Sequence, residues 1–220
     1  MRRRQAGFSF IEILVVMGII SVLVSMVVFF VPMIQERARR TKSVDNVSGM
    51  LKFFLADGLG VSKPWPAYNG KNFTLWLVAA NKIDRRDDKQ LQVLFSPGDQ
   101  YYTFDKADGI KGFAALTLEV LRTENSDLIK LTSYAGRRNK EKEHLLSSSE
   151  LSKGAIVLCD DDDGPLHHKD GMVIGYSSGQ ARFVEWSDLG MGPPADEKDP
   201  TGLLGDNSPN DDLKHMSSGN

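Results

Sequence analysis

The stretch Phe8-Ser9-Phe10-Ile11-Glu12-Ile13-Leu14-Val15-Val16 begins an apolar run that continues to Val31. As a helix rising about 1.5 Å per residue, Phe8 to Val31 would span roughly 36 Å, more than a bilayer's hydrocarbon core of about 30 Å. One carboxylate, Glu12, lies near the start of this run. A charged side chain in lipid costs about 2.5 to 3.5 kcal/mol, so Glu12 is predicted to have a functional partner.

The residues before the run predict the orientation of the chain. Arg2, Arg3 and Arg4 favour a cytoplasmic N-terminus, which places the C-terminal bulk across the membrane. A secretory signal peptide has its small residues after the apolar run, whereas Ala6-Gly7 precede it here. Cleavage after Gly7 would create a new amino group on Phe8, four residues from Glu12. Alternatively, Glu12 is favoured at this position by the helix dipole alone.

The basic leader, Gly7, Phe8 and the segment Phe10 to Val16 resemble the prepilin signature of type IV pilins and type II secretion pseudopilins. The resemblance implies cleavage after Gly7 by a prepilin peptidase and N-methylation of Phe8. It also implies that Glu12 pairs with the Phe8 ammonium of a neighbouring subunit during assembly. Pairing would lower the cost of holding either charge in lipid. The implied partners are the peptidase, other pilin-like subunits in a homo- or hetero-polymer, an inner-membrane assembly platform and membrane lipid.

A second resemblance covers segments further along the chain. Ser96-Pro97-Gly98-Asp99, Ser133-Tyr134-Ala135-Gly136 and the stretch Cys159 to Trp186 are similar to a large bacterial group of pilin-like proteins. That group has a C-terminal motif of His, nine residues and Asp-Gly. Here His168 is followed by nine residues and then Ser178-Gly179, so Ser replaces Asp. The group often has a Cys at the position of Ser96, so the resemblance implies that Cys159 lacks its usual cysteine partner here.

Composition fits a membrane-anchored globular domain. The 27 basic and 29 acidic residues give the precursor a net charge of −2, and removal of the three leader arginines leaves 24 against 29, or −5. This balance does not suggest nucleic-acid binding. The single cysteine excludes an intrachain disulfide. Cys159 is expected to be a buried small hydrophobe at a strand end, or else to pair with another chain.

We predict an α+β, type IV pilin-like fold in which a long N-terminal helix packs on a small antiparallel sheet. Its parts are a leader over 1–7, a helix over 8–57 that is transmembrane over 8–31, a globular domain over 58–189 and a disordered tail over 190–220. Pro32 should kink the helix without ending it, and Asp57-Gly58 should stop it. Only three large aliphatic residues among many polar residues, glycines and prolines predict the disorder of the tail.

The sheet is predicted from short apolar or alternating runs. Met172–Tyr176 and Ala181–Trp186 form a hairpin in which Gly179 adopts a positive φ. Further strands are expected at 91–95, 101–104, 128–131 and 155–158, and 73–80 is a short helix or strand. Aromatic residues at 65, 68 and 76 are either core residues or binding anchors.

One acidic segment suggests a metal site. Carboxylates at Asp160, Asp161, Asp162, Asp163 and Asp170 surround Gly164 and the pair His167-His168, and hard oxygen ligands suit calcium. The resemblance adds calcium binding in the C-terminal loops of some pseudopilins. Cys159 with both histidines could instead hold zinc, and a solvated acidic turn needs no ion. No cofactor is predicted apart from this possible calcium.

Catalysis is not expected, because no phosphate loop or His-Glu-x-x-His occurs, and Gly175-Tyr176-Ser177-Ser178-Gly179, although it reads Gly-x-Ser-x-Gly, falls in the predicted hairpin turn. The sequence predicts a structural subunit of a type IV pilus-like or type II secretion pseudopilus fibre for protein export. Its expected location is the bacterial inner membrane as a single-pass protein, with the C-terminal domain in the periplasm or in a fibre. The alternative is a non-polymerising, membrane-anchored binding module.

Overall fold

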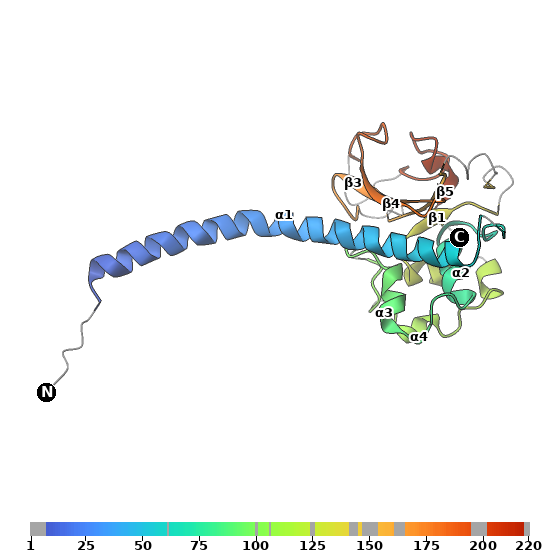
Figure 1. Ribbon diagram of the computed structural model, residues 1–220, viewed down its shortest axis with the longest axis horizontal. Coiled ribbons are helices and arrows are strands. Elements are labelled where there is room, and N and C mark those ends of the chain that lie inside the picture. Colours follow the sequence, from blue (N-terminus) through green and yellow to red (C-terminus); the bar gives the residue numbers. More distant parts are fainter. Residues whose placement is uncertain are drawn as a thin grey trace. The chain divides into compact units, whose positions relative to one another are not determined.

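The computed structural model describes residues 8–60, 62–99, 101–105, 107–123, 126–140, 145–146, 154–160, 166–194 and 202–217. The chain forms two compact units, Met1–Ala38 and Arg39–Asn220. One helix, α1 (Phe10–Ala56), begins in the first unit and ends in the second (Figure 1).

The long N-terminal helix agrees with the sequence prediction. Its 47 residues include Pro32, so the helix continues through the proline, and it ends at Ala56, directly before Asp57-Gly58. Within α1, the buried residues all lie between Ser43 and Phe54. The helix therefore contributes to a protein core through its last part only.

A five-stranded antiparallel sheet lies in the second unit (Figure 1). Its strand order is β4-β3-β2-β1-β5. The strands are β1 (Ala135–Arg137), β2 (Ile156–Cys159), β3 (Gly171–Tyr176), β4 (Ala181–Glu185) and β5 (Met216–Ser217). The predicted hairpin is confirmed as β3 and β4, and Gly179 in its turn has a φ of 89°. The α+β class is confirmed as well.

The two faces of the sheet belong to two hydrophobic cores. On one face, α1 contributes Val47, Met50, Leu51 and Phe54 to a core that includes Val157, Leu158 and Val173. On the other, the side chains of Ile156, Cys159, Met172, Ile174 and Val184 are buried together. A register shift between Ile156 and Leu158 in β2 lets two successive residues, Val157 and Leu158, join the same core.

Three predicted strands are wrong. Residues 91–94 lie in α3 (Asp88–Leu91) and η1 (Gln92–Leu94), and Phe95 follows η1. Residues 101–104 lie in a segment of bends and turns. Residues 128–131 lie in η3 (Ser126–Leu131). Short apolar runs have no clear period, so they cannot distinguish a strand from one buried helical turn. The ambiguous segment 73–80 is helical, as part of α2 (Gly70–Ala79). Within the described residues, the other short helices are α4 (Ile110–Phe113), η2 (Val120–Arg122) and η5 (Leu213–His215).

The prediction of a disordered tail is wrong for residues 202–217. This segment contains η5 and β5, and β5 pairs with β1 at the edge of the sheet. Leu203, Leu204, Leu213 and Met216 are buried in the second core. The few aliphatic residues of the tail are ordered because the second face of the sheet is itself apolar and requires a cover.

Candidate assembly segment and buried polar cluster

The predicted processing and assembly residues lie at the start of α1. Phe8 precedes the helix and is 85% exposed. The backbone N–H of Ser9 donates to Glu12 Oε2 at 2.7 Å. Ser9-Phe10-Ile11-Glu12 thus has the spacing of a capping box, in which the third helical residue accepts from the N-cap backbone. Gly7 lies outside the described residues.

The capping bond shows what Glu12 does in an isolated chain. Its carboxylate satisfies one of the free N–H groups at the helix start and adds negative charge where the helix dipole favours it. The structure therefore contains the local arrangement considered for Glu12 in the sequence. It does not test pairing with the amino group of a second chain.

The apolar part of α1 presents its side chains outward. The large hydrophobic residues from Phe8 to Ile34 are all at least 40% exposed. By length and composition, α1 can cross a membrane. The hydroxyls of Ser21 and Ser25 donate to the carbonyls of Met17 and Ser21, both at 2.8 Å, so these polar groups are satisfied within the helix. This surface requires lipid or other apolar helices around it.

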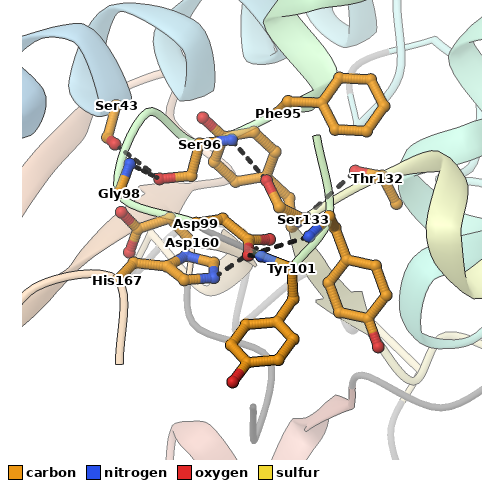
Figure 2. Close-up of polar contacts among 12 residues, drawn as sticks. Ser43, Phe95, Ser96, Gly98, Asp99, Tyr101, Thr132, Ser133, Asp160 and His167 are labelled. Carbon is orange, nitrogen blue, oxygen red and sulfur yellow. Dashed lines mark hydrogen bonds and ion pairs between the residues drawn. The ribbon is translucent and has the colours of Figure 1, made fainter. Parts of the chain in front are cut away.

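A second group of functional candidates forms a cluster inside the second unit. It brings together residues from all three segments of the second resemblance, including Asp160 of the acidic segment (Figure 2). We call it the buried polar cluster, and its members are Ser43, Asn46, Ser96, Asp99, Thr132, Ser133, Asp160, His167 and His168.

The first half of the buried polar cluster connects α1 to the Ser96–Asp99 turn. The Ser43 and Ser96 hydroxyls lie 2.9 Å apart, and Asn46 Nδ2 donates to the Phe95 carbonyl at 2.9 Å. The Ser96 backbone N–H donates to the Ser133 hydroxyl (Figure 2). Ser96, at the position of the expected Cys, is therefore a hydrogen-bonding residue at a junction of three segments.

Asp99 and His167 form the first of two buried His–Asp pairs. His167 Nε2 lies 3.4 Å from Asp99 Oδ2, and the backbone N–H groups of Tyr101 and Tyr102 donate to Asp99 Oδ1 at 2.7 and 3.0 Å. Burial raises the pKa of Asp99, but His167 and the two N–H donors together lower it by more than burial raises it. This pKa therefore lies below its usual value. Asp99 is therefore held as a carboxylate.

Asp160 and His168 form the second pair, at the junction of β2 and β3. Asp160 Oδ2 lies 3.1 Å from His168 Nε2, and both side chains are fully buried. The Val173 backbone N–H donates to Asp160 Oδ1 at 2.6 Å. His168 also contacts Phe183 edge to face, with ring centroids 5.7 Å apart. Nearby, burial and the Asp160 charge raise the pKa of Tyr134 far above its usual value, so its phenol stays neutral.

Ser43, His168 and Asp160 contain the residue types of a catalytic triad but not its geometry. His168 Nε2 faces both the Ser43 hydroxyl, at 3.3 Å, and the Asp160 carboxylate. A triad needs the two ring nitrogens to face different partners, so that one holds the carboxylate while the other takes the serine proton. Ser43 is also fully buried. The arrangement is therefore one of packing and hydrogen bonding.

The two predicted calcium ligands that the structure describes, Asp160 and Asp170, lie in different environments. Asp160 is buried within the polar cluster, whereas Asp170 lies at the surface and forms an ion pair with Arg40 at 2.6 Å. Asp161, Asp162 and Asp163 lie outside the described residues. Among the described residues, no group of three His, Cys, Asp or Glu side chains could hold a metal ion. Calcium binding stays a prediction.

The cysteine and the tryptophans considered in the sequence analysis pack in or against the hydrophobic cores. Cys159 is buried in the second core. Trp65 is 5% exposed and packs with Phe54 and Phe73, and Trp76 packs against the same core while remaining partly accessible. The His–Asp pairs were missed in the sequence, although a signal exists. Asp160 directly follows a buried strand and His167-His168 precede the next one, so antiparallel pairing brings them to the same end of the sheet.

Comparison with known proteins gives a match to a family model. Residues 2–28 match the model of the prokaryotic N-terminal methylation motif. This match supports the resemblance to type IV pilin-like proteins and pseudopilins. It does not reach the His168 region, so the narrower resemblance stays a prediction. Neither the curated proteins nor the solved structures gave a match to the chain.

Proposed function

We propose that this chain, with its prokaryotic N-terminal methylation motif over residues 2–28, is a structural subunit of a type IV pilus-like or type II secretion pseudopilus fibre. A prepilin peptidase cleaves it after Gly7 and methylates Phe8. The N-terminal part of α1 holds the subunit in the inner membrane, with the second unit on the periplasmic side. An assembly platform then transfers the subunit into a polymer.

One observation supports polymerisation most directly. Glu12 lies at the start of a helix whose large hydrophobic residues are exposed as far as Ile34. The hydrocarbon core of a bilayer covers these side chains but offers no cation to Glu12, whereas a neighbouring methylated Phe8 offers both an apolar ring and a cation. The Ser9–Glu12 hydrogen bond is then the arrangement before assembly. On assembly, Glu12 pairs with the neighbouring Phe8 ammonium, either in addition to this bond or in place of it.

That same hydrogen bond favours the second candidate, a membrane-anchored binding module that does not polymerise. If capping the helix is all that Glu12 does, the residue needs no second subunit. Two substitutions separate these roles. Glu12→Gln keeps a side-chain oxygen that can accept from Ser9 but removes the charge, whereas Glu12→Ala removes both.

The experiment begins with the intact mass and N-terminal sequence of the protein extracted from its native membrane. We expect a mature chain beginning at methylated Phe8. Sheared fibres or subunit complexes are then isolated from cells that produce the wild type, Glu12→Gln or Glu12→Ala. We expect both variants to be cleaved and membrane-bound, yet absent from fibres, because both lack the charge.

The opposite results are equally clear. Normal incorporation of Glu12→Gln with loss of Glu12→Ala would assign Glu12 to helix capping alone. Normal incorporation of both variants, or no polymer of the wild type, would favour the anchored binding module. An uncut N-terminus would contradict prepilin processing itself.

A further inference from the structure

A cavity of about 1180 Å³ lies in the second unit, apart from the buried polar cluster. Its walls are the residues directly after α1, the loop that contains Trp65 and Tyr68, one side of α2 and residues near Leu121 and Asn139. Small-molecule sites commonly measure about 300 to 1,000 Å³. The cavity is therefore large enough for a ligand of several rings.

An aromatic surface forms part of this cavity. The Trp76 ring stacks on Phe54, with centroids 5.8 Å apart and an interplanar angle of 10°. Trp76 is partly exposed and lines the cavity, so part of its ring is accessible to a ligand. Tyr68, whose hydroxyl donates to the Leu118 carbonyl at 3.3 Å, adds a second partly exposed ring.

Hydrogen bonds hold the aromatic wall in place. Asn139 Nδ2 donates to the carbonyls of Pro66 and Trp65 at 2.9 and 3.3 Å, and the Asn139 backbone N–H donates to the Tyr68 carbonyl at 3.1 Å. The Lys140 backbone N–H donates to the Asn69 side chain at 2.9 Å. A site that is ordered before binding loses less conformational entropy when a ligand arrives.

The charged residues of the cavity are mostly basic. Asp57, its single described acidic residue, already pairs with Lys82 and, at 3.3 Å, with Lys63. Arg122 and Lys140 also line the cavity and are exposed, and neither pairs with a carboxylate in the part of the chain that the structure describes. The rim is therefore suited to an anion.

We propose that this cavity binds an acidic saccharide. The C–H groups on one face of a sugar ring suit the negative face of Trp76, while carboxylate or sulfate groups pair with Arg122 and Lys140. An acidic peptide is the weaker alternative, because none of the described lining residues belongs to a strand that could extend the sheet. This binding does not depend on whether the chain polymerises.

The test uses the full chain in detergent and isothermal titration calorimetry. The probes are tetragalacturonate, its fully methyl-esterified form, a sulfated heparin tetrasaccharide and tetraglutamate. The double variant Arg122→Gln/Lys140→Gln removes the rim charge without disturbing the core. Arg86→Gln/Lys89→Gln is the matched control, since both residues lie at the surface and are not among the described lining residues of the cavity. Trp76→Phe and Trp76→Ala test stacking, with unfolding curves to verify the fold.

We expect saturable binding of at least one acidic saccharide and binding at least tenfold weaker for the esterified probe and for the Arg122/Lys140 variant. The control should match the wild type, and Trp76→Phe should retain more affinity than Trp76→Ala. The proposal is overturned if neither acidic saccharide binds, if the rim variant binds as well as the control, or if tetraglutamate binds as tightly as the saccharides.

Discussion

Replacement of Asp160 by alanine should destabilise the second unit strongly. The substitution leaves the Val173 N–H, which donates at 2.6 Å, without its acceptor, and it removes the carboxylate 3.1 Å from His168 Nε2. A buried donor left unsatisfied costs about 1 to 3 kcal/mol, and loss of the carboxylate beside the buried His168 ring adds a cost of about the same size. These terms overlap because they share one side chain, so we expect a total loss of about 3 to 5 kcal/mol.

Urea unfolding of the full chain in detergent, followed by tryptophan fluorescence, measures this loss. His168→Ala and the double variant complete a thermodynamic cycle, whose coupling energy we expect to be about 1 to 3 kcal/mol. Asp170→Ala is the matched control, because the Asp170 side chain is 65% exposed and its surface pair with Arg40 should contribute less than about 1 kcal/mol. A loss below about 1 kcal/mol for Asp160→Ala, or zero coupling to His168, would refute this account of the buried polar cluster.

Further predictions concern Asp99, the acidic segment and the tail. The pKa of Asp99 is lower in the folded protein than in the unfolded chain, where it is about 3.9. The ionised Asp99 carboxylate should therefore stabilise the fold fully above this unfolded pKa, and its contribution should decline as the pH falls toward the folded pKa. Asp99→Asn should remove this part of the pH dependence of unfolding, and identical pH profiles for the wild type and the variant would contradict the prediction. Calcium bound at the predicted site near Asp160 and Asp170 should raise the melting temperature in excess calcium above that in EGTA, because the ion binds the folded chain. Agreement within about 1 °C would contradict the site. Leu213→Ala should lower the free energy of unfolding by about 2 to 5 kcal/mol because Leu213 is fully buried, and Leu145→Ala, at a side chain 46% exposed, is its control; equal, small effects would show that the tail contributes no core.

The parts of the fold that sequence predicts well have long or regular patterns. The helix follows from an apolar run too long for any other element, and the β3–β4 hairpin follows from two short β-type runs around a glycine turn. In contrast, Leu128–Leu131 offered only four residues, and its helical turn is set by contacts with the rest of the core. Leu213 and Met216 were missed because their burial depends on the opposite face of a sheet that is distant in sequence.

The candidate sites divide in the same way. Glu12 could be identified because a carboxylate in an apolar run violates a local pattern. Asp99 and Asp160 occur in polar, glycine-containing segments that resemble surface turns, and only the tertiary structure places their carboxylates beside histidines in the interior. The cavity near Trp76 likewise combines segments separated by more than 60 residues, from Trp76 to Asn139.

The continuity of α1 has a mechanical consequence. No loop separates its apolar part from the residues that enter the core at Val47 and Phe54, so tension applied near Phe10 reaches the sheet along a chain of helical hydrogen bonds. Pro32 has no N–H for the carbonyl of Val28, which leaves one bond missing from that chain. In the proposed fibre, the helical turn from Val28 to Pro32 would therefore be the weakest part of α1 under tension.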